Sequence, residues 1–197
     1  MQKVAILILA AGTSSRMKDK VKQLLPWQHT TLLGHAIAEA KKVTKHDVFV
    51  VLGANTALIK SHIKEEEITI LEHEHWKKGL GSSIAFGITH LNSLNFYDAV
   101  FILLADQPLI DAPFLGRMLK EYECDTTKII ATKYPNNKGV PAIFAKEYFD
   151  DLINLTGDTG AKYLINTKNV ACIDPKEKSV DIDTWEEYER LRDKLKV

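Results

Sequence analysis

The sequence predicts an α/β protein: one doubly wound, mostly parallel sheet flanked by helices, with a small additional lobe. Two apolar runs, VAILILA at 4–10 and AVFILLA at 99–105, lack the polar alternation of half-exposed strands. Such runs are typical of central parallel strands that are covered on both faces. Strand-like and helix-like segments also alternate over the first 133 residues, which indicates a doubly wound sheet.

The order of elements in this first part follows from short apolar runs and from helical periodicity. We predict strands at 3–10, 47–52, 68–71, 99–105 and 128–132, and helices at 32–42, 55–63, 82–94 and 112–122. Asn- and Asp-type caps are common at these helix starts. In sheets of this class, ligands bind beyond the carboxyl ends of the strands, so the residues that follow each apolar run are the first candidates for a site.

The pattern changes after about residue 133. Strand pieces are predicted at 140–145, 170–173 and 180–182, short helices at 148–152 and 161–166, and a charged closing helix at 185–194. We interpret the chain as a single domain over 1–197, with one part at about 1–133 and a second part at about 134–197.

Composition excludes several classes of protein. The chain has 197 residues and is 45% hydrophobic, which suits one compact core. Lys plus Arg number 26 and Asp plus Glu number 26, and this zero balance argues against a nucleic-acid binder. Cys124 and Cys172 are far apart, so neither a zinc site nor a disulfide framework is expected. The apolar runs are too short for a bilayer span, and we expect a cytoplasmic protein without a membrane partner.

A turn of small residues follows the first strand. Leu9, Ala10, Ala11, Gly12 and Ser14 lead to Arg16, and the amide N–H groups of such a turn can point at phosphate oxygens. The segment is neither a P-loop nor a dinucleotide fingerprint. Lys18, Lys20 and Lys22 come next; they form either a solvated loop or a source of positive charge for a triphosphate.

Two carboxylates follow other predicted strands. Asp106 ends the run at 99–105 and is either a turn residue or an oxygen ligand for Mg²⁺. Asp183 precedes the closing helix, which Asp183 or Thr184 could cap; the alternative for Asp183 is a second carboxylate for the same metal, and spacing alone favours the cap. The stretch from Glu72 to Trp76 resembles a metal cluster, but we interpret it as a solvated loop because no other run of ligands supports it.

Two glycine-containing segments lie in the second part of the chain. Gly157, Asp158, Gly160 and Lys162 combine a turn with a helix start, and Gly139 and Pro141 form another tight segment. Each is either a plain turn or a close approach to a ligand phosphate.

Six segments, taken in order, resemble the molybdenum-cofactor cytidylyltransferase family, nucleotidyltransferases with a Rossmann-like, glycosyltransferase-like α/β fold. The matches are LAAGxSxRM at 9–17 followed by KQLLP at 22–26, W-x-x-G-x-x-x-S at 76–83, ADQP at 105–108, G-x-P-x-x-F at 139–144, GDxGA at 157–161 and DIDT at 181–184. The resemblance covers nearly the whole chain. It implies transfer of CMP from CTP to a phosphorylated pterin, with release of pyrophosphate.

The resemblance also implies roles for the candidate residues. Catalysis would rest on Arg16, Lys22 and Asp106, and Mg²⁺ on Asp106 and Asp183. The nucleotide would lie against Leu9, Ala10, Ala11, Gly12, Ser14, Gly79 and Ser83. The acceptor would lie against Gly139, Pro141, Asp158, Gly160 and Lys162 in an acceptor-side lobe. Delivery of the finished cofactor implies transient docking to a molybdenum hydroxylase.

Some positions depart from the family pattern. Ala11 favours CTP, because the guanylyl type carries a second glycine there. The spacing to the aligned lysine is one residue longer than expected, so Lys20 is an alternative to Lys22. Lys18, His73 and Lys162 replace the usual glycine, asparagine and arginine, and Lys162 loses the bidentate geometry of arginine. These departures leave GTP, or a sugar or polyol phosphate acceptor, as alternatives; a cofactor-binding chaperone without catalysis is the alternative from another class.

Overall fold

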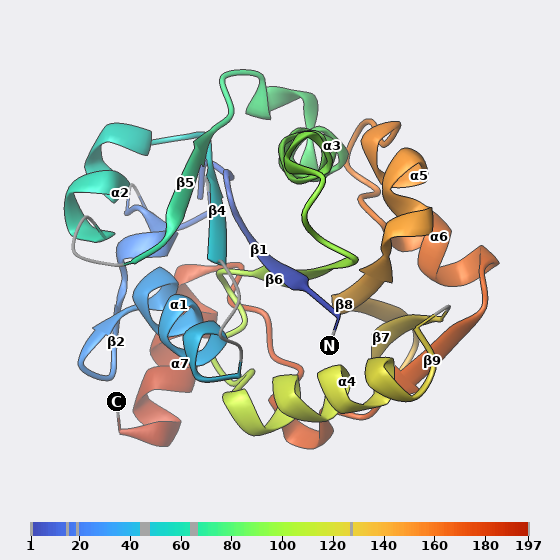
Figure 1. The fold of residues 1–197 in the computed structure, drawn as a ribbon. Helices are drawn as coiled ribbons and strands as arrows, with labels where there is room; N and C mark the ends of the chain where they lie inside the picture. The colour runs from blue at the N-terminus through green and yellow to red at the C-terminus, as the bar shows by residue number, and fades with distance from the viewer. Residues whose placement is uncertain are drawn as a thin grey trace.

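The computed structural model describes residues 2–14, 16–18, 20–43, 48–63, 67–126 and 128–196. A seven-stranded sheet in the order β5-β4-β1-β6-β8-β7-β9 forms its centre (Figure 1). The strands are β1 Val4–Ala10, β4 Val48–Leu52, β5 Thr69–Glu72, β6 Ala99–Leu104, β7 Ile129–Lys133, β8 Lys138–Ala145 and β9 Val170–Ile173. Most neighbours are parallel; β8 runs antiparallel to both β6 and β7. The predicted fold class is confirmed.

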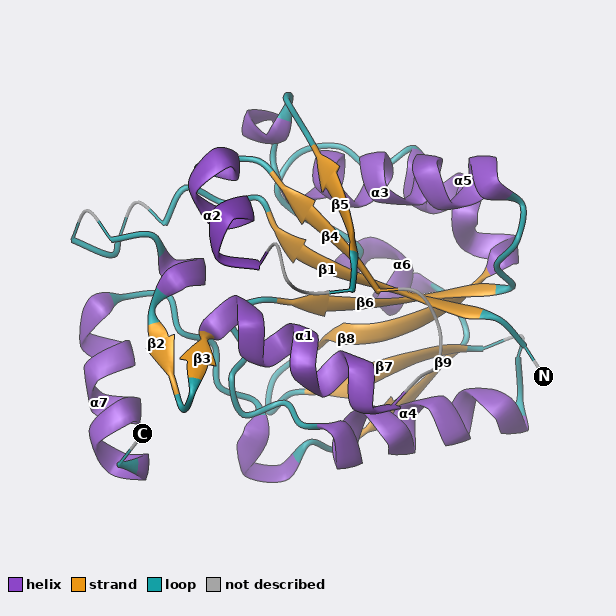
Figure 2. Ribbon diagram, turned by 60° about the vertical axis from the view of Figure 1, so that its left-hand side comes forward, coloured by secondary structure: helices purple, strands orange, loops and turns teal. Residues whose placement is uncertain are grey.

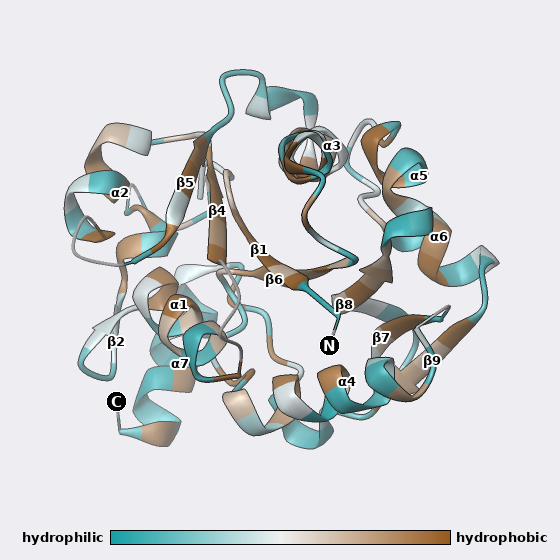
Figure 3. Cartoon of the chain, viewed as in Figure 1, coloured by the Kyte–Doolittle hydropathy of each residue, from teal (hydrophilic) through white to brown (hydrophobic). Residues whose placement is uncertain are grey.

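Helices cover both faces of the sheet (Figures 1 and 2). One face carries α1 Leu32–Val43, α2 Thr56–Ile63 and α4 Ala112–Cys124, and the other carries α3 Leu80–Leu94, α5 Phe149–Ile153 and α6 Lys162–Thr167. Strand β1 shows why both faces are needed, because all seven of its residues are buried. Ile6 and Ile8 pack on the first face and Leu7 on the second. The strands are accordingly the hydrophobic centre of the fold (Figure 3).

A smaller core lies beyond the carboxyl ends of the central strands (Figure 2). Here the hairpin of β2 Pro26–Trp27 and β3 Thr30–Thr31 meets the closing helix α7 Trp185–Leu195. Met17, Trp27 and Ile182 are fully or almost fully buried in this core, and Tyr188 Oη donates to Pro26 O at 2.8 Å. This packing brings residues 17–32 against residues 182–191 at the edge where ligands of doubly wound sheets bind.

The predicted elements occur within two residues of their expected bounds, with one exception. The predicted strand at 180–182 is wrong: the segment has no strand assignment and lies outside the sheet. Its Ile182 N–H donates to Asp106 O at 3.0 Å, so it crosses the strand ends instead of pairing along an edge. The predicted start at Asp47 lies outside the described residues. The division at about residue 133 stays a prediction.

Short 3₁₀ helices complete the described elements: η1 Lys22–Leu24, η2 Trp76–Lys78, η3 Lys146–Tyr148 and η4 Lys176–Lys178. Within the described residues, no helix is both long and apolar enough to cross a membrane.

Candidate functional site

The loop after β1 is held by one buried amide. Gln23, only 4% exposed, donates from Nε2 to Ala10 O at 2.9 Å and to Gly12 O at 3.0 Å. Its Oε1 accepts from Ser14 Oγ at 3.1 Å, and Ser14 Oγ accepts from the Lys22 N–H at 3.0 Å. These four bonds fix the loop to η1. The backbone of Ala11 and Gly12 therefore keeps a defined shape at the end of the sheet.

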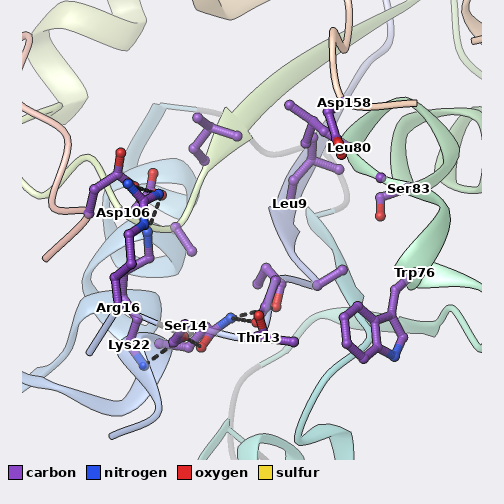
Figure 4. Close-up of a pocket in the computed structure, with 18 of the residues that line it drawn as sticks. Leu9, Thr13, Ser14, Arg16, Lys22, Trp76, Leu80, Ser83, Asp106 and Asp158 are labelled. Carbon is purple, nitrogen blue, oxygen red and sulfur yellow. Dashed lines mark hydrogen bonds and ion pairs between the residues drawn. The ribbon is translucent and has the colours of Figure 1, made fainter. Parts of the chain in front are cut away.

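A cavity of about 410 Å³ opens above this loop (Figure 4). Its lining includes every residue predicted for catalysis, metal binding or nucleotide binding: Leu9, Ala10, Ala11, Gly12, Ser14, Arg16, Lys22, Gly79, Ser83, Asp106 and Asp183. Figure 4 shows two ends, with Arg16, Lys22 and Asp106 on one side and Trp76 and Ser83 on the other. The fold thus brings together residues from four separate parts of the sequence.

The charged end centres on Lys22. Its Nζ lies 2.6 Å from Asp106 Oδ2 and 3.4 Å from Asp183 Oδ1, across 84 and 161 residues of chain. Arg16 Nη2 lies 3.4 Å from the same Asp183 oxygen, on a side chain that is 66% exposed. One ammonium therefore bridges two carboxylates that sequence alone could not bring together. Lys20, the alternative lysine, lies with its Nζ 4.9 Å from the centre of the Trp185 ring.

Asp183 reaches this end because another residue caps the helix. Thr184 is the N-cap of α7 and forms a capping box with Glu187, whose side chain also accepts from the Asp183 N–H at 2.9 Å. The helix-cap interpretation of Asp183 is therefore wrong. A capping box satisfies the first amides of a helix, which leaves the Asp183 carboxylate to face Lys22.

The two carboxylates fit a divalent cation. Asp106 Oδ1 is buried and has no hydrogen-bond partner. A buried oxygen without a partner costs free energy, which a hydrogen-bond donor or a bound cation would offset. Mg²⁺ prefers oxygen ligands and is commonly held by one or two carboxylates together with substrate phosphates. Among the described residues no group of three or more acidic, His or Cys side chains is placed to hold a metal ion.

The other end of the cavity is built at the start of α3. Trp76 packs against Gly53 so closely that a Cβ on that glycine would lie 2.5 Å from the indole carbons. Gly79 has φ +97°, a conformation that favours glycine, and a Cβ there would lie 2.4 Å from Asp158 Oδ1. Ser83 is 3% exposed and lines the cavity one turn later. Close backbone approach therefore shapes this end.

His73 differs from its prediction as part of a solvated loop. It is 7% exposed, its ring stacks on Phe86 with centroids 4.6 Å apart, and its Nε2 lies 3.0 Å from Ser82 Oγ. Burial, followed by the charges of His75 and Lys78, lowers the pKa of His73. The residue supports the start of α3 as a neutral ring.

A second cavity of about 230 Å³ adjoins the first, and both share Leu9, Leu80 and Leu104. Of the five predicted acceptor residues, Gly139 and Lys162 line this second cavity, whereas Asp158 lines the first. Neither Pro141 nor Gly160 appears among the described residues that line the two cavities. Pro141 is buried in β8, and Gly160 has φ +55° and packs against Leu80.

Sequence reasoning missed several residues of the two cavities. Gln23 and Gln107 lie inside recognised motifs, next to Lys22 and Asp106, so their position was a usable signal. Asp181 is the first residue of the DIDT segment. Tyr134 carried no signal, because only the antiparallel pairing of β7 and β8 brings it to the site.

Comparison with known proteins gives a family model and several relatives. The model for the MobA-like NTP transferase domain matches residues 6–172. The nicotine blue oxidoreductase of Paenarthrobacter nicotinovorans is 27% identical, with 94% of each chain covered.

Solved structures agree with the fold. An Rv0371c homologue from Mycobacterium sp. strain JC1 is 30% identical, covers 98% of this chain and 96% of its own, and superposes with a TM-score of 0.81. The manganese complex of Rv0371c from Mycobacterium tuberculosis H37Rv is 23% identical, covers 96% of this chain and 97% of its own, and has a TM-score of 0.77. At that identity the last likeness concerns the fold alone.

Proposed function

Because the chain belongs to the MobA-like NTP transferase domain family, we propose that it transfers CMP from CTP to the phosphate of molybdopterin or the molybdenum cofactor, with release of pyrophosphate. The observation that carries the proposal is the charged end of the first cavity. There one ammonium and two carboxylates meet beside the loop at 9–14 that lines the same cavity. Nucleotidyl transfer needs such a site, because charge on the phosphate oxygens must be neutralised while the reactants are held in line.

Each residue of the first cavity has a proposed part. The nucleoside lies toward Trp76, Gly79 and Ser83, and the triphosphate lies along the loop at 9–14. Arg16 and Lys22 bind its oxygens, with Lys22 at the α-phosphate. Asp106 and Asp183 would hold Mg²⁺, which supplies charge neutralisation at the transferred phosphate. The manganese complex of Rv0371c, a protein of the same fold, supports a divalent ion.

The acceptor lies in the second cavity, beside Gly139 and Lys162. Its phosphate oxygen attacks the α-phosphorus, the bond to the β-phosphate oxygen breaks, and pyrophosphate leaves. The enzyme forms no covalent intermediate, since positioning and charge neutralisation are enough. Delivery of the product requires transient docking to a molybdenum hydroxylase, and the compartment we propose is the cytoplasm.

The test is pyrophosphate release with Mg²⁺ and molybdenum cofactor, compared among CTP, GTP, ATP and UTP. Release with CTP alone supports the proposal. Release with GTP would assign the guanylyl type despite Ala11, and release only with a sugar or polyol phosphate would replace the acceptor. If the folded protein released no pyrophosphate with any nucleotide or acceptor, the proposal of CMP transfer would be wrong, and a cofactor-binding chaperone would be favoured.

A further inference from the structure

A buried amide joins three parts of the second cavity. Gln107 is 5% exposed, and its Nε2 donates to Tyr134 Oη at 2.7 Å and to Asp181 Oδ1 at 2.8 Å. Nε2 also donates to Val140 O at 3.4 Å. A backbone carbonyl and a carboxylate can only accept hydrogen bonds, so the nitrogen of the amide must face Val140 and Asp181. The amide orientation is therefore fixed, and Oε1 is left buried without a hydrogen-bond partner. A buried oxygen without a partner costs stability. The contribution of Gln107 at this position is therefore the hydrogen bonds that hold Tyr134 and Asp181.

The segment at 181–183 places one carboxylate in each cavity. Burial alternates along it, because Ile182 is fully buried whereas Asp181 is exposed and Asp183 is half-buried. The Ile182 N–H bond to Asp106 O at 3.0 Å fixes the register. As a result Asp183 lines the first cavity and Asp181 the second.

Asp181 is not neutralised by its hydrogen-bond partner. In the part of the chain that the structure describes, Gln107 is its side-chain partner, and no Lys or Arg forms an ion pair with it. Its Oδ1 therefore has a neutral amide as partner, and the residue as a whole is exposed where it lines the second cavity. A carboxylate in this setting has a strong demand for N–H donors.

The rest of the second cavity suits a flat ring. Its walls are largely aliphatic, from Leu9, Leu80, Ile84, Leu104, Val140 and Ile165. Pockets with mostly apolar walls bind the carbon framework of an organic ligand and fix its orientation with a few polar contacts. A phosphate would be repelled at Asp181, so the acceptor phosphate must lie away from this carboxylate, toward the first cavity.

We infer that Asp181 is the residue that recognises the acceptor: its carboxylate accepts two N–H hydrogens from the edge of a planar nitrogen heterocycle, and Gln107 is the positioning residue that holds it. This assignment rests on the proposed function, because a pterin is such a heterocycle. Its 2-amino group and ring N–H form a two-donor edge that matches a carboxylate.

The test uses two soluble probes and equilibrium binding by calorimetry. Pterin presents the two-donor edge, and lumazine has an oxygen in place of the 2-amino group. The wild-type protein is expected to bind pterin about 10- to 100-fold more tightly than lumazine, the range for a charged hydrogen bond. Asp181→Asn should lose this preference, because an amide pairs with either edge. Gln107→Ala should reduce it, because the carboxylate is no longer held.

Asp183→Asn is the matched control from the same segment. It should keep the pterin preference and lose binding of CTP with Mg²⁺, whereas Asp181→Asn should keep CTP binding, which also shows that this variant is folded. In turnover, Asp181→Asn should raise KM for the acceptor and leave KM for CTP unchanged.

The two hypotheses fail in different ways. If pyrophosphate release is absent but the pterin preference depends on Asp181, the acceptor assignment survives and CMP transfer does not. An unchanged preference or acceptor KM in Asp181→Asn, or a wild-type protein that binds neither probe, would overturn the assignment.

Discussion

Lys22 Nζ is held between Asp106 and Asp183, and this contact distinguishes it from the other lysines of its loop. We expect Lys22→Met to lower kcat/KM for CTP by about 10²–10³-fold, because one fixed donor to a developing phosphate charge is lost. Lys20→Met is the matched control, since Lys20 lies over Trp185 instead, and it should change kcat/KM less than about threefold. The measurement is steady-state pyrophosphate release. A larger loss in Lys20→Met than in Lys22→Met would reverse the assignment.

A substitution at Asp106 distinguishes an effect on catalysis from an effect on folding. Asp106→Asn keeps the shape of the side chain but removes the charge that pairs with Lys22 and with a divalent ion. Turnover should fall by at least about 10²-fold, while circular dichroism and the thermal midpoint stay close to those of wild type. If turnover survived in the folded variant, the metal assignment would be wrong.

At the scale of elements, a carboxylate from one helix supports the start of another. Glu39 in α1 accepts from the Ala112 N–H of α4 at 2.7 Å and from Lys42 Nζ at 2.5 Å. Burial disfavours the charge of Glu39, but the Lys42 ammonium and the Ala112 amide outweigh it and lower the pKa of Glu39 below its ordinary value of 4.5. Glu39→Gln should therefore destabilise the protein by about 1–2 kcal/mol at pH 7.

The stability difference between wild type and Glu39→Gln should depend on pH in one direction. A lowered folded pKa gives stability that is present above pH 4.5 and lost as the pH falls through the folded value. Urea unfolding at pH 7 and at progressively lower pH should show the gap between wild type and Glu39→Gln closing in acid. A gap that stayed constant or widened would show that Glu39 acts through packing alone.

Most elements could be predicted because the apolar runs of a covered sheet and the periodicity of its helices are local signals. The Val180–Ile182 segment could not, since a valine and an isoleucine around one aspartate have the pattern of a strand. Only the Ile182 bond to Asp106 O shows that it crosses the strand ends. The preference for Asp183 as the helix cap was wrong for a similar reason. Thr184 is an equally good capping residue, and Glu187 completes a capping box with it.

At the scale of the whole molecule, the motif residues gather because parallel strands β1 and β6 end at one edge. Motifs therefore predicted the lining of the first cavity. Of the predicted acceptor residues, only Gly139 and Lys162 line the second cavity, whose wall also includes Val140 in the antiparallel β8 and Tyr134, which follows β7. The antiparallel direction of β8 is a property of the sheet topology, and no single segment of the sequence indicates it.

The same topology predicts a global response to nucleotide. Ligands at the first cavity join residues from both ends of the chain, so CTP with Mg²⁺ should stabilise the entire fold. At a CTP concentration about 100-fold above Kd the gain is about 2.7 kcal/mol, or a rise of about 5–10 °C in the thermal midpoint of a chain this size. Differential scanning fluorimetry measures it, with Asp106→Asn as control. An equal rise in that variant would argue against metal-assisted binding.

The bridge between Lys22 and the two carboxylates has a consequence for the order in which ligands arrive. Lys22 is already the counter-ion of both carboxylates, so a free metal ion would compete with a tethered ammonium for them. A nucleotide that carries its own ion would lessen this competition, because its phosphates would be an alternative partner for Lys22 while Asp106 and Asp183 would hold the ion. Binding is therefore expected to be concerted, with weak affinity for the ion alone and the metal–nucleotide complex as the species that enters.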